Sequence, residues 1–351
     1  MTTEIFRVDI KDIEASRSQL KYAAKKICDG SLVVFPTETV YGLGGDATNP
    51  EAAKKIFEAK GRPSDNPLII HIATPEDAEP YAVTNELYYE LAKRFMPGPI
   101  TVILDSKDTI PKETRGGLST VAVRCPENPI ARELIRYAGV PIAAPSANLS
   151  GSPSPTTAQH VIDDMKGRVD VIIDGGACEF GLESTIVKIN SDNTLTLLRP
   201  GKITAEELLS VATVKIADAV VDKLADGEVA LSPGMKYRHY APKSPLVLLD
   251  GDLESRIEYI KEENLNYTAV LVYSEELSLF SSQLPSVKLY DLGSISDEYS
   301  QAQRLFYILR EADKCDFTKI YAPLPDTAGV GLALYNRMIR AAAHTIINLR
   351  R

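Results

Sequence analysis

Short apolar runs alternate with segments of helical periodicity along the first part of the chain. Apolar runs bounded by Gly, Pro, Asn or Asp are typical of strands, and apolar residues recurring every three or four positions are typical of helices. The predicted strands lie at 32–35, 68–72, 100–104, 121–124, 140–144, 169–174, 185–189 and 194–198. The predicted helices cover 16–30, 49–61 and 86–95, and another begins at Asn128. This alternation predicts an α/β fold with parallel, nearly continuously apolar strands that helices cover on both faces.

The periodicity weakens between residues 201 and 243. A weak helix is predicted at 205–211, and an acidic, mixed stretch follows it. The sequence SPGMKYRHYAP at 232–242 contains two prolines and no periodicity, which predicts a loop. This loop is richer in hydrogen-bonding side chains than a simple tether needs to be, which suggests a functional role.

A second block begins at Pro245 and again alternates strands with helices. The predicted strands are 246–249, 269–273, 287–289 and 320–322, and the predicted helices are 253–263, 296–314 and 330–344. This order predicts a small Rossmann-like domain, although the GxGxxG motif of dinucleotide-binding domains is missing. We therefore expect a domain at 1–213, a connecting segment at 214–244 and a smaller domain at 245–351.

Composition agrees with two globular domains and restricts the function. The chain has 351 residues, and about 150 residues per domain is usual. The formal charge of −9 speaks against a protein that wraps nucleic acid, but it leaves room for a local basic pocket. The four cysteines form no CxxC pair, so a zinc or dithiol site is not indicated. We see neither a signal peptide nor an apolar run of membrane-spanning length, so we expect a cytoplasmic protein without a membrane partner.

Five polar clusters lie where predicted strands meet loops. They are PTETVYGLGG at 36–45, KGRPSDN at 60–66 followed by His71, STVAVR at 119–124, PSANLSGSPSPT at 145–156, and ESTIV at 183–187 with RPG at 199–201. Each cluster alone fits an ordinary turn or loop. Lys60 alone would suit a helix C-terminus, and His71 alone a core histidine. Strand ends are, however, where open α/β sheets bind ligands, and three clusters supply Lys or Arg, so together they predict a polyanion site such as a nucleoside triphosphate site.

In this order, the clusters resemble the threonylcarbamoyl-AMP synthase family, which has a YrdC-like catalytic domain. The resemblance runs from about Ile13 to Ala212, and residues 232–242 with the second block resemble the two-domain form of these enzymes. It implies that L-threonine, bicarbonate and ATP are converted to threonylcarbamoyl-AMP and pyrophosphate. A separate transferase complex would then modify adenosine 37 of tRNAs that read ANN codons. The implied fold is a twisted open α/β sheet with a concave, positively lined cleft.

The resemblance also implies roles for individual residues. The residues implied for ATP binding are Lys60, Arg62, Asn66, Thr120, Ser146, Asn148, Ser154, Arg199 and His239, of which Lys60 and Arg62 are expected to be catalytic. The residues implied for the threonine side are Thr39, His71, Arg124 and Ser184. Their division between the two ligands stays open because both ligands share one cleft. Residues 232–242 are expected to form a lid in which His239 and Tyr240 face the ligand.

The resemblance and the sequence together limit the chemistry. Mg²⁺ is expected with the ATP phosphates, although no cluster in the sequence resembles an all-protein metal cage. The attacking group would be a carboxylate oxygen, so we expect positioning and charge stabilisation rather than a nucleophilic side chain. This agrees with the absence of Walker A, HExxH, GxSxG and kinase motifs.

Other functions remain open at this point. The cations at 60, 62, 124 and 199 could instead line the basic cleft of an RNA-binding module without turnover, which steep salt dependence and no ATP turnover would reveal. The net charge argues against this alternative, and we expect no tight tRNA binding. A carbamoyltransferase with a YrdC-like domain would need zinc-finger cysteines and further domains. Nothing specific indicates a ligand-sensing regulator built on the second block.

Overall fold

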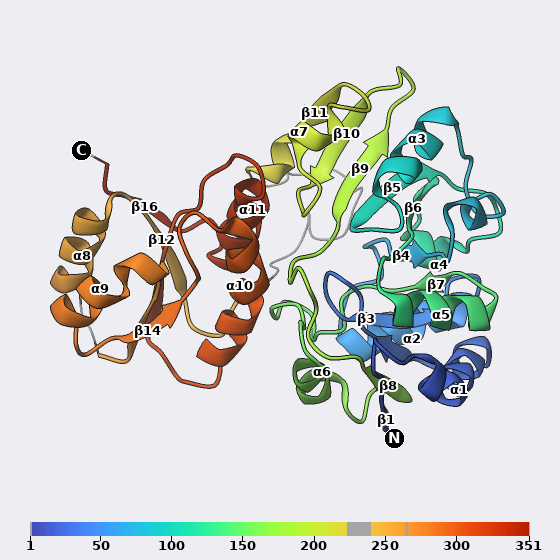
Figure 1. Ribbon diagram of the computed structural model, residues 1–351, viewed down its shortest axis with the longest axis horizontal. Coiled ribbons are helices and arrows are strands. Elements are labelled where there is room, and N and C mark those ends of the chain that lie inside the picture. Colours follow the sequence, from blue (N-terminus) through green and yellow to red (C-terminus); the bar gives the residue numbers. More distant parts are fainter. Residues whose placement is uncertain (1, 223–239, 264–265, 351) are drawn as a thin grey trace. The chain divides into compact units, whose positions relative to one another are not determined.

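The computed structural model describes residues 2–222, 240–263 and 266–350 (Figure 1). The chain divides into two compact units. The first unit is Met1–Ser150 with Ser154–Lys236, and the second is Gly151–Pro153 with Tyr237–Arg351. Three residues in the middle of the PSANLSGSPSPT motif thus belong to the second unit.

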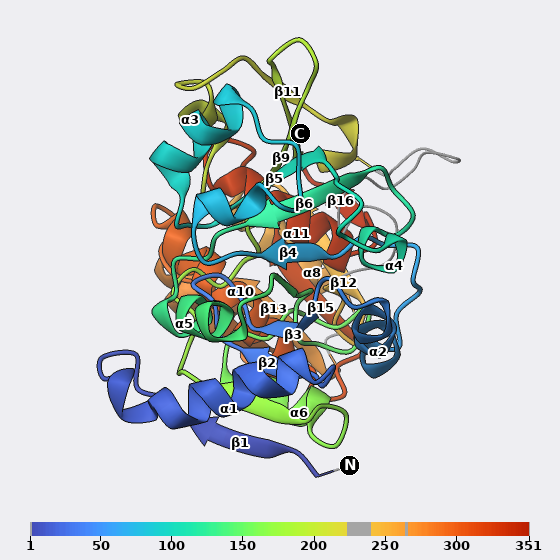
Figure 2. The ribbon, with the colours of Figure 1, turned by 90° about the vertical axis from the view of Figure 1, so that its right-hand side faces the viewer.

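One long, mixed sheet organises the described part of the first unit. Its strands are β1 (Glu4–Arg7), β2 (Val33–Phe35), β3 (Gly42–Asp46), β4 (Ile69–His71), β5 (Ile100–Asp105), β6 (Thr120–Arg124), β7 (Ile142–Ala143), β8 (Val171–Asp174), β9 (Thr185–Ile189), β10 (Leu195–Arg199) and β11 (Val214–Ile216). Their order is β1-β8-β2-β3-β7-β4-β6-β5-β9-β10-β11, and Figure 2 shows them following one another from β1 to β11. β3, β7 and β5 each run antiparallel to a neighbour, so the expectation of an all-parallel sheet is wrong here.

Helices cover this sheet, and their ends follow from local sequence. They are α1 (Arg17–Cys28), α2 (Pro50–Lys60), α3 (Glu86–Phe95), α4 (Lys112–Arg115), α5 (Pro129–Ala138), α6 (Ala158–Met165) and α7 (Ala205–Leu208), with short 3₁₀ turns at Glu14–Ser16, Pro75–Ala78 and Asp218–Val220. Asn49 caps α2 by accepting a hydrogen bond from the Glu51 N–H, Pro50 fills the first helical position, and Gly61 ends the helix with a left-handed φ of 62°. The buried faces of α1 and α5 pack together on strands β2 and β8.

Glycine in β3 allows the sheet to close tightly around this strand. A Cβ at Gly44 would lie 2.7 Å from the Phe35 ring and 2.8 Å from the Ile142 side chain, both of which are buried. Because no side chain fits at that spacing, the strand depends on glycine at this position. The glycine-rich composition also explains why periodicity predicts no strand there.

The second unit has the predicted Rossmann-like form. Its strands β12 (Leu246–Asp250), β13 (Thr268–Val272), β14 (Lys288–Asp291), β15 (Lys319–Pro323) and β16 (Ile346–Asn348) are all parallel, in the order β14-β13-β15-β12-β16. Its helices are α8 (Leu253–Glu262), α9 (Leu277–Gln283), α10 (Glu298–Ala312) and α11 (Gly331–Ala341), with a 3₁₀ turn at Ser274–Glu276. α8 and α9 cover one face of the sheet, and α10 and α11 cover the other (Figure 1).

The α/β fold class is confirmed, and most predicted elements are present. The elements that the sequence analysis missed are short, exposed or glycine-rich: β1, β3, β11, β16, α4, α6 and α9. Ser16 makes no capping hydrogen bond through its side chain, because a 3₁₀ turn leads into α1. No helix in the described part of the chain has the length and apolarity that crossing a bilayer requires.

Candidate active site

Five neighbouring strands of the first unit place a row of residues across the sheet. His71 on β4 is the register partner of Arg124 on β6, and Arg124 is the partner of Thr101 on β5. The row continues from Thr101 to Ile186 on β9 and from Ile186 to Arg199 on β10. Three sequence clusters that are far apart along the chain are therefore joined by strand pairing. We call these five residues the transverse row.

The Arg124 guanidinium is a buried cation of the row that makes several polar contacts. Its Nη2 donates to Glu38 Oε1 at 2.7 Å and to Thr39 Oγ1 at 2.8 Å, and it lies 3.5 Å from Thr37 Oγ1. Arg124 and Glu38 are each 4% exposed, so their ion pair is shielded from water. Arg124 Nε is also buried, and it has no hydrogen-bond partner among the described residues. A buried donor of this kind is typical of a site that a ligand completes.

His71 is buried beside this guanidinium and is neutral. Burial, together with the Arg124 charge, lowers the pKa of His71 to about 3. Its Nδ1 lies 3.3 Å from the Ile142 carbonyl oxygen, and its ring meets the Phe35 ring edge to face. At neutral pH His71 therefore acts through hydrogen bonding and shape rather than through charge.

Ser184 joins the middle of the row to its end. Its Oγ lies 2.8 Å from Thr101 Oγ1 and accepts a 3.0 Å hydrogen bond from Arg199 Nη2, while its carbonyl accepts from Arg199 Nε at 3.0 Å. All three residues are buried. Arg199 thus fixes both the backbone and the hydroxyl of Ser184 just before β9 begins.

Lys60 holds the loop that follows β7. Its Nζ donates to the carbonyls of Ser146 at 2.5 Å and Asn148 at 2.7 Å, and it is only 3% exposed. Ser146 Oγ in turn donates to Asn148 Oδ1 at 2.5 Å. Because Lys60 is the last residue of α2, the capped helix fixes where this charge meets the loop.

The segment after α2 carries Arg62 and Asn66. Arg62 is half-buried, with its guanidinium 5.9 Å from the centre of the Phe57 ring. Asn66 is fully buried, and neither its side-chain oxygen nor its nitrogen has a hydrogen-bond partner among the described residues. An unsatisfied buried amide costs free energy unless a ligand or water pairs with it, so this residue indicates a second binding position.

Strand register separates the two ends of the site. Ile69 pairs with Ala122, so Asn66 and Thr120 lie toward the amino-terminal ends of β4 and β6, while His71 and Arg124 are at the carboxyl ends. Four residues of extended strand span roughly 13 Å. That distance suits two ligands bound along the same strands better than one small ligand.

Residues of the PSANLSGSPSPT loop make hydrogen bonds within each of the two units. Ser154 donates a hydrogen bond to the Glu183 carboxylate, and both side chains are buried in the first unit. Within the second unit, the Gly151 carbonyl accepts from the Ala241 N–H at 3.0 Å. The Pro153 carbonyl accepts from Arg310 Nε at 3.0 Å and from Arg310 Nη2 at 2.7 Å.

Comparison with known proteins covers almost the whole chain. A family model described as "Telomere recombination" matches residues 25–201, and one described as "Threonylcarbamoyl-AMP synthase, C-terminal domain" matches residues 203–343. A threonylcarbamoyl-AMP synthase of Bacillus subtilis is 44% identical over 99% of this chain and 100% of its own length. One of Pyrococcus abyssi is 42% identical over 94% of this chain and 96% of its own.

The chain belongs to the threonylcarbamoyl-AMP synthase family. The structure of P. abyssi Sua5 complexed with L-threonine matches it with a TM-score of 0.87 at 39% identity, and each chain is covered completely. Another P. abyssi Sua5 structure gives a TM-score of 0.89 at 40% identity and covers 100% of this chain and 99% of its own. This family member is an enzyme that uses ATP and forms threonylcarbamoyl-AMP, so the predicted family and function are confirmed. The RNA-binding alternative finds no support.

The threonylcarbamoyl-AMP synthase fold also gathers residues that the sequence analysis did not name. Glu38, Thr101 and Glu183 each bond directly to a predicted site residue. Glu38 and Glu183 lie inside the sequence clusters, each directly before a predicted site residue, Thr39 or Ser184. This position in the sequence was a signal by which both could have been found. Thr101 had no signal in the sequence, because only strand register brings it to the site.

Of the expected lid at 232–242, the structure describes only residues 240–242. His239 lies outside the described residues, as do residues 232–238. Tyr240 is buried in the second unit, where its ring stacks on the Phe306 ring with 5.2 Å between the ring centres. The Arg337 guanidinium lies over the Tyr240 ring, 5.6 Å from its centre. Tyr240 has a left-handed φ of 63°, a costly backbone conformation that this packing stabilises.

The described residues offer no protein-made metal site. Within 2–222, 240–263 and 266–350, no three His, Cys, Asp or Glu side chains are grouped to hold an ion. The side chains on these segments therefore do not form a cage for Mg²⁺.

Proposed function

We propose that the first unit binds L-threonine at the carboxyl ends of β4 and β6 and ATP beside the α2 C-terminus. The observation that carries this proposal is the transverse row, which places a buried guanidinium with an unused Nε next to hydroxyls and a neutral imidazole. A guanidinium is suited to a carboxylate, and hydroxyls are suited to the ammonium and hydroxyl of an amino acid. Thr39, His71, Arg124 and Ser184 form this threonine side.

The nucleotide side follows from the loop that Lys60 fixes. We assign ATP to Lys60, Arg62, Asn66, Thr120, Ser146, Asn148, Ser154, Arg199 and His239. Lys60 holds the loop and keeps a positive charge beside it, Arg62 supplies a fork for phosphate oxygens, and Asn66 supplies an amide that no described residue satisfies. Lys60 and Arg62 are the catalytic residues in this assignment, because their charges would offset the charge that develops on the phosphates.

The chemistry then needs no nucleophilic side chain. The threonine amine and bicarbonate give an N-carboxylate and water. An oxygen of that carboxylate attacks the α-phosphorus of ATP, the bond to the β-phosphate oxygen breaks, and pyrophosphate leaves. Arg124 and its neighbours orient the carboxylate, while the nucleotide residues hold the phosphorus in line with it. Mg²⁺ would accompany the ATP phosphates.

The remaining proposals concern the roles of the other parts of the chain, the cellular location and the partner. Residues 1–213 form the catalytic domain and 245–351 form the second domain. Of the connecting segment 214–244, β11 (Val214–Ile216) pairs with β10 in the sheet of the first unit, and the rest would carry the lid residues His239 and Tyr240. The enzyme acts in the cytoplasm and passes its product to a tRNA threonylcarbamoyl transferase complex. It does not bind tRNA tightly, in keeping with the net charge of −9.

The test is pyrophosphate release from ATP with threonine and bicarbonate each present or omitted. We expect release only when both are present, and release without threonine would contradict the proposal. Arg62→Ala should lose most of this activity while keeping the fold, because Arg62 lies beyond the end of α2. Arg94→Ala, an exposed arginine in the last turn of α3, is the matched control and should keep full activity.

A further inference from the structure

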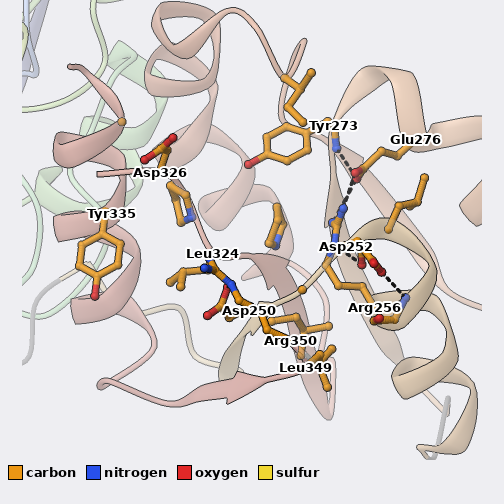
Figure 3. A pocket seen from close by; sticks show the side chains of 18 of the residues that line it. Asp250, Asp252, Arg256, Tyr273, Glu276, Leu324, Asp326, Tyr335, Leu349 and Arg350 are labelled. Carbon is orange, nitrogen blue, oxygen red and sulfur yellow. Dashed lines mark hydrogen bonds and ion pairs between the residues drawn. The ribbon is translucent and has the colours of Figure 1, made fainter. Parts of the chain in front are cut away.

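A second pocket lies within the Rossmann-like unit, at the carboxyl ends of its parallel strands (Figure 3). It has a volume of about 1300 Å³. Its walls come from the residues that follow β12, β13, β15 and β16. The loop after β12 leads to α8 on one face of the sheet, and the loop after its neighbour β15 leads to α11 on the other. Open α/β sheets bind ligands at such a divergence of loops.

Tyr273 places an unused polar group in this pocket. The side chain is 8% exposed, and its hydroxyl has no hydrogen-bond partner among the described residues. Figure 3 shows the hydroxyl pointing into the pocket, toward the side where Asp326 lies. Burial raises the pKa of Tyr273, so the hydroxyl keeps its proton at neutral pH and can both donate and accept.

The charge of the lining selects the kind of ligand. Seven acidic residues are among those that line the pocket: Asp250, Asp252, Glu254, Glu258, Glu276, Glu298 and Asp326. Its two arginines are already paired, Arg256 with Glu276 in a buried ion pair and Arg350 with Asp250 at 2.7 Å. The lining therefore carries a net negative charge that a cation would neutralise.

Anions are excluded by the same residues. Phosphate groups in Rossmann-like domains usually bind at a helix N-terminus. Here Asp252 accepts from the Ser255 N–H at 2.8 Å at the start of α8, and Glu298 accepts from the Gly331 N–H at 2.9 Å at the start of α11. Carboxylates thus occupy both helix ends, and an incoming phosphate would meet negative charge instead of free N–H groups.

We propose that this pocket binds a small organic cation, an aliphatic oligoamine with two or more ammonium groups. Ammonium groups can donate to the Tyr273 hydroxyl oxygen and to Asp326, while the remaining carboxylates accept from the other end of the chain. The volume suits an extended organic molecule rather than a bare ion. No group of metal-binding side chains is present among the described residues, which also favours an organic cation. This site is independent of the catalytic assignments made above.

Calorimetric titration of the full chain with spermidine tests the proposal. Tyr273→Phe removes only the hydroxyl and should weaken binding by roughly threefold to tenfold, the range for one lost hydrogen bond to a charged group. Asp326→Asn should weaken it by about fivefold at low salt, because one charge of the lining is lost. The matched controls are Tyr267→Phe and Asp316→Asn, both exposed and outside the pocket lining, and these should bind like the parent.

The outcomes separate the proposal from surface attraction. Weakening in either pocket variant, with both controls unchanged, supports an oligoamine site. Three outcomes overturn it: no saturable spermidine binding, binding that is equal in both pocket variants and the controls, or binding of pyrophosphate or Mg²⁺ alone that depends on Tyr273. Thermal unfolding with and without spermidine provides an independent readout, since a ligand of the folded state raises the melting temperature.

Discussion

The neutral state of His71 makes a quantitative prediction about acid stability. In the folded protein, Arg124 from β6, the Ile142 carbonyl from β7 and the Phe35 ring from β2 surround the imidazole. Burial and, after it, the Arg124 charge lower its pKa from 6.5 to about 3, and the Ile142 carbonyl opposes this shift only in part. In the unfolded chain the imidazole takes up a proton near pH 6.5. Acid therefore stabilises the unfolded state. The free energy of unfolding keeps its full value with respect to His71 above pH 6.5, and it declines as the pH falls from 6.5 toward 3.

The loss in free energy of unfolding at pH 5 depends little on the pKa that His71 has in the folded protein. This pH is 1.5 units below 6.5, the ordinary pKa of histidine, so the imidazole of the unfolded chain is protonated. The imidazole of the folded protein stays unprotonated for any folded-state pKa below about 4. Each pH unit corresponds to about 1.36 kcal/mol, so His71 alone should lower the free energy of unfolding by about 2 kcal/mol between pH 8 and pH 5.

Urea unfolding of the parent and His71→Gln at pH 8, 6.5 and 5 measures this difference. Glutamine cannot titrate, so the variant should be less stable at pH 8 but should lose about 2 kcal/mol less than the parent on going to pH 5. Val33→Ala provides a control, because it removes buried apolar surface from β2 without changing a titratable group. Equal pH dependence in the parent and His71→Gln would refute the assignment of a buried, neutral histidine.

Three further substitutions test the site. Arg124→Met should destabilise the fold by about 3 to 5 kcal/mol because it leaves the Glu38 carboxylate buried without its cation, and adding Glu38→Gln should recover much of that loss in chemical unfolding. Asn66→Ala should leave the melting temperature nearly unchanged, since no described partner is lost, but should lower pyrophosphate release by about tenfold at limiting ATP. Arg310→Ala removes two hydrogen bonds to the Pro153 carbonyl and should raise the KM for ATP several-fold more than it lowers kcat. Equal changes in KM and kcat would contradict a role for this loop in binding the nucleotide.

Local sequence was sufficient for the elements that carry the clusters. The α2 helix was predicted because Asn49, Pro50 and Gly61 mark its ends, and the structure uses all three as expected. The strand that ends at Arg124 was predicted from its apolar run. In both cases the information lies within a few residues, so no knowledge of distant segments is needed.

The arrangement of the site depends on distant segments and could not be predicted in this way. Which residue lies opposite Arg124 is decided by strand pairing with β4 and β5, and a shift of one residue would turn every side chain to the other face. Thr101 shows the consequence, because nothing in its own neighbourhood marks it as a partner of Ser184. β3 was missed for the opposite reason: its glycines are required by the packing of Phe35 and Ile142, which periodicity does not record.

Net charge alone says little about the site. The cations Lys60, Arg124 and Arg199 are each less than 8% exposed, and protein oxygens hold all three in place. Charges buried in this way act through a lower effective dielectric than exposed carboxylates do. A negative net charge therefore does not exclude a small polyanion from a site where buried cations are concentrated.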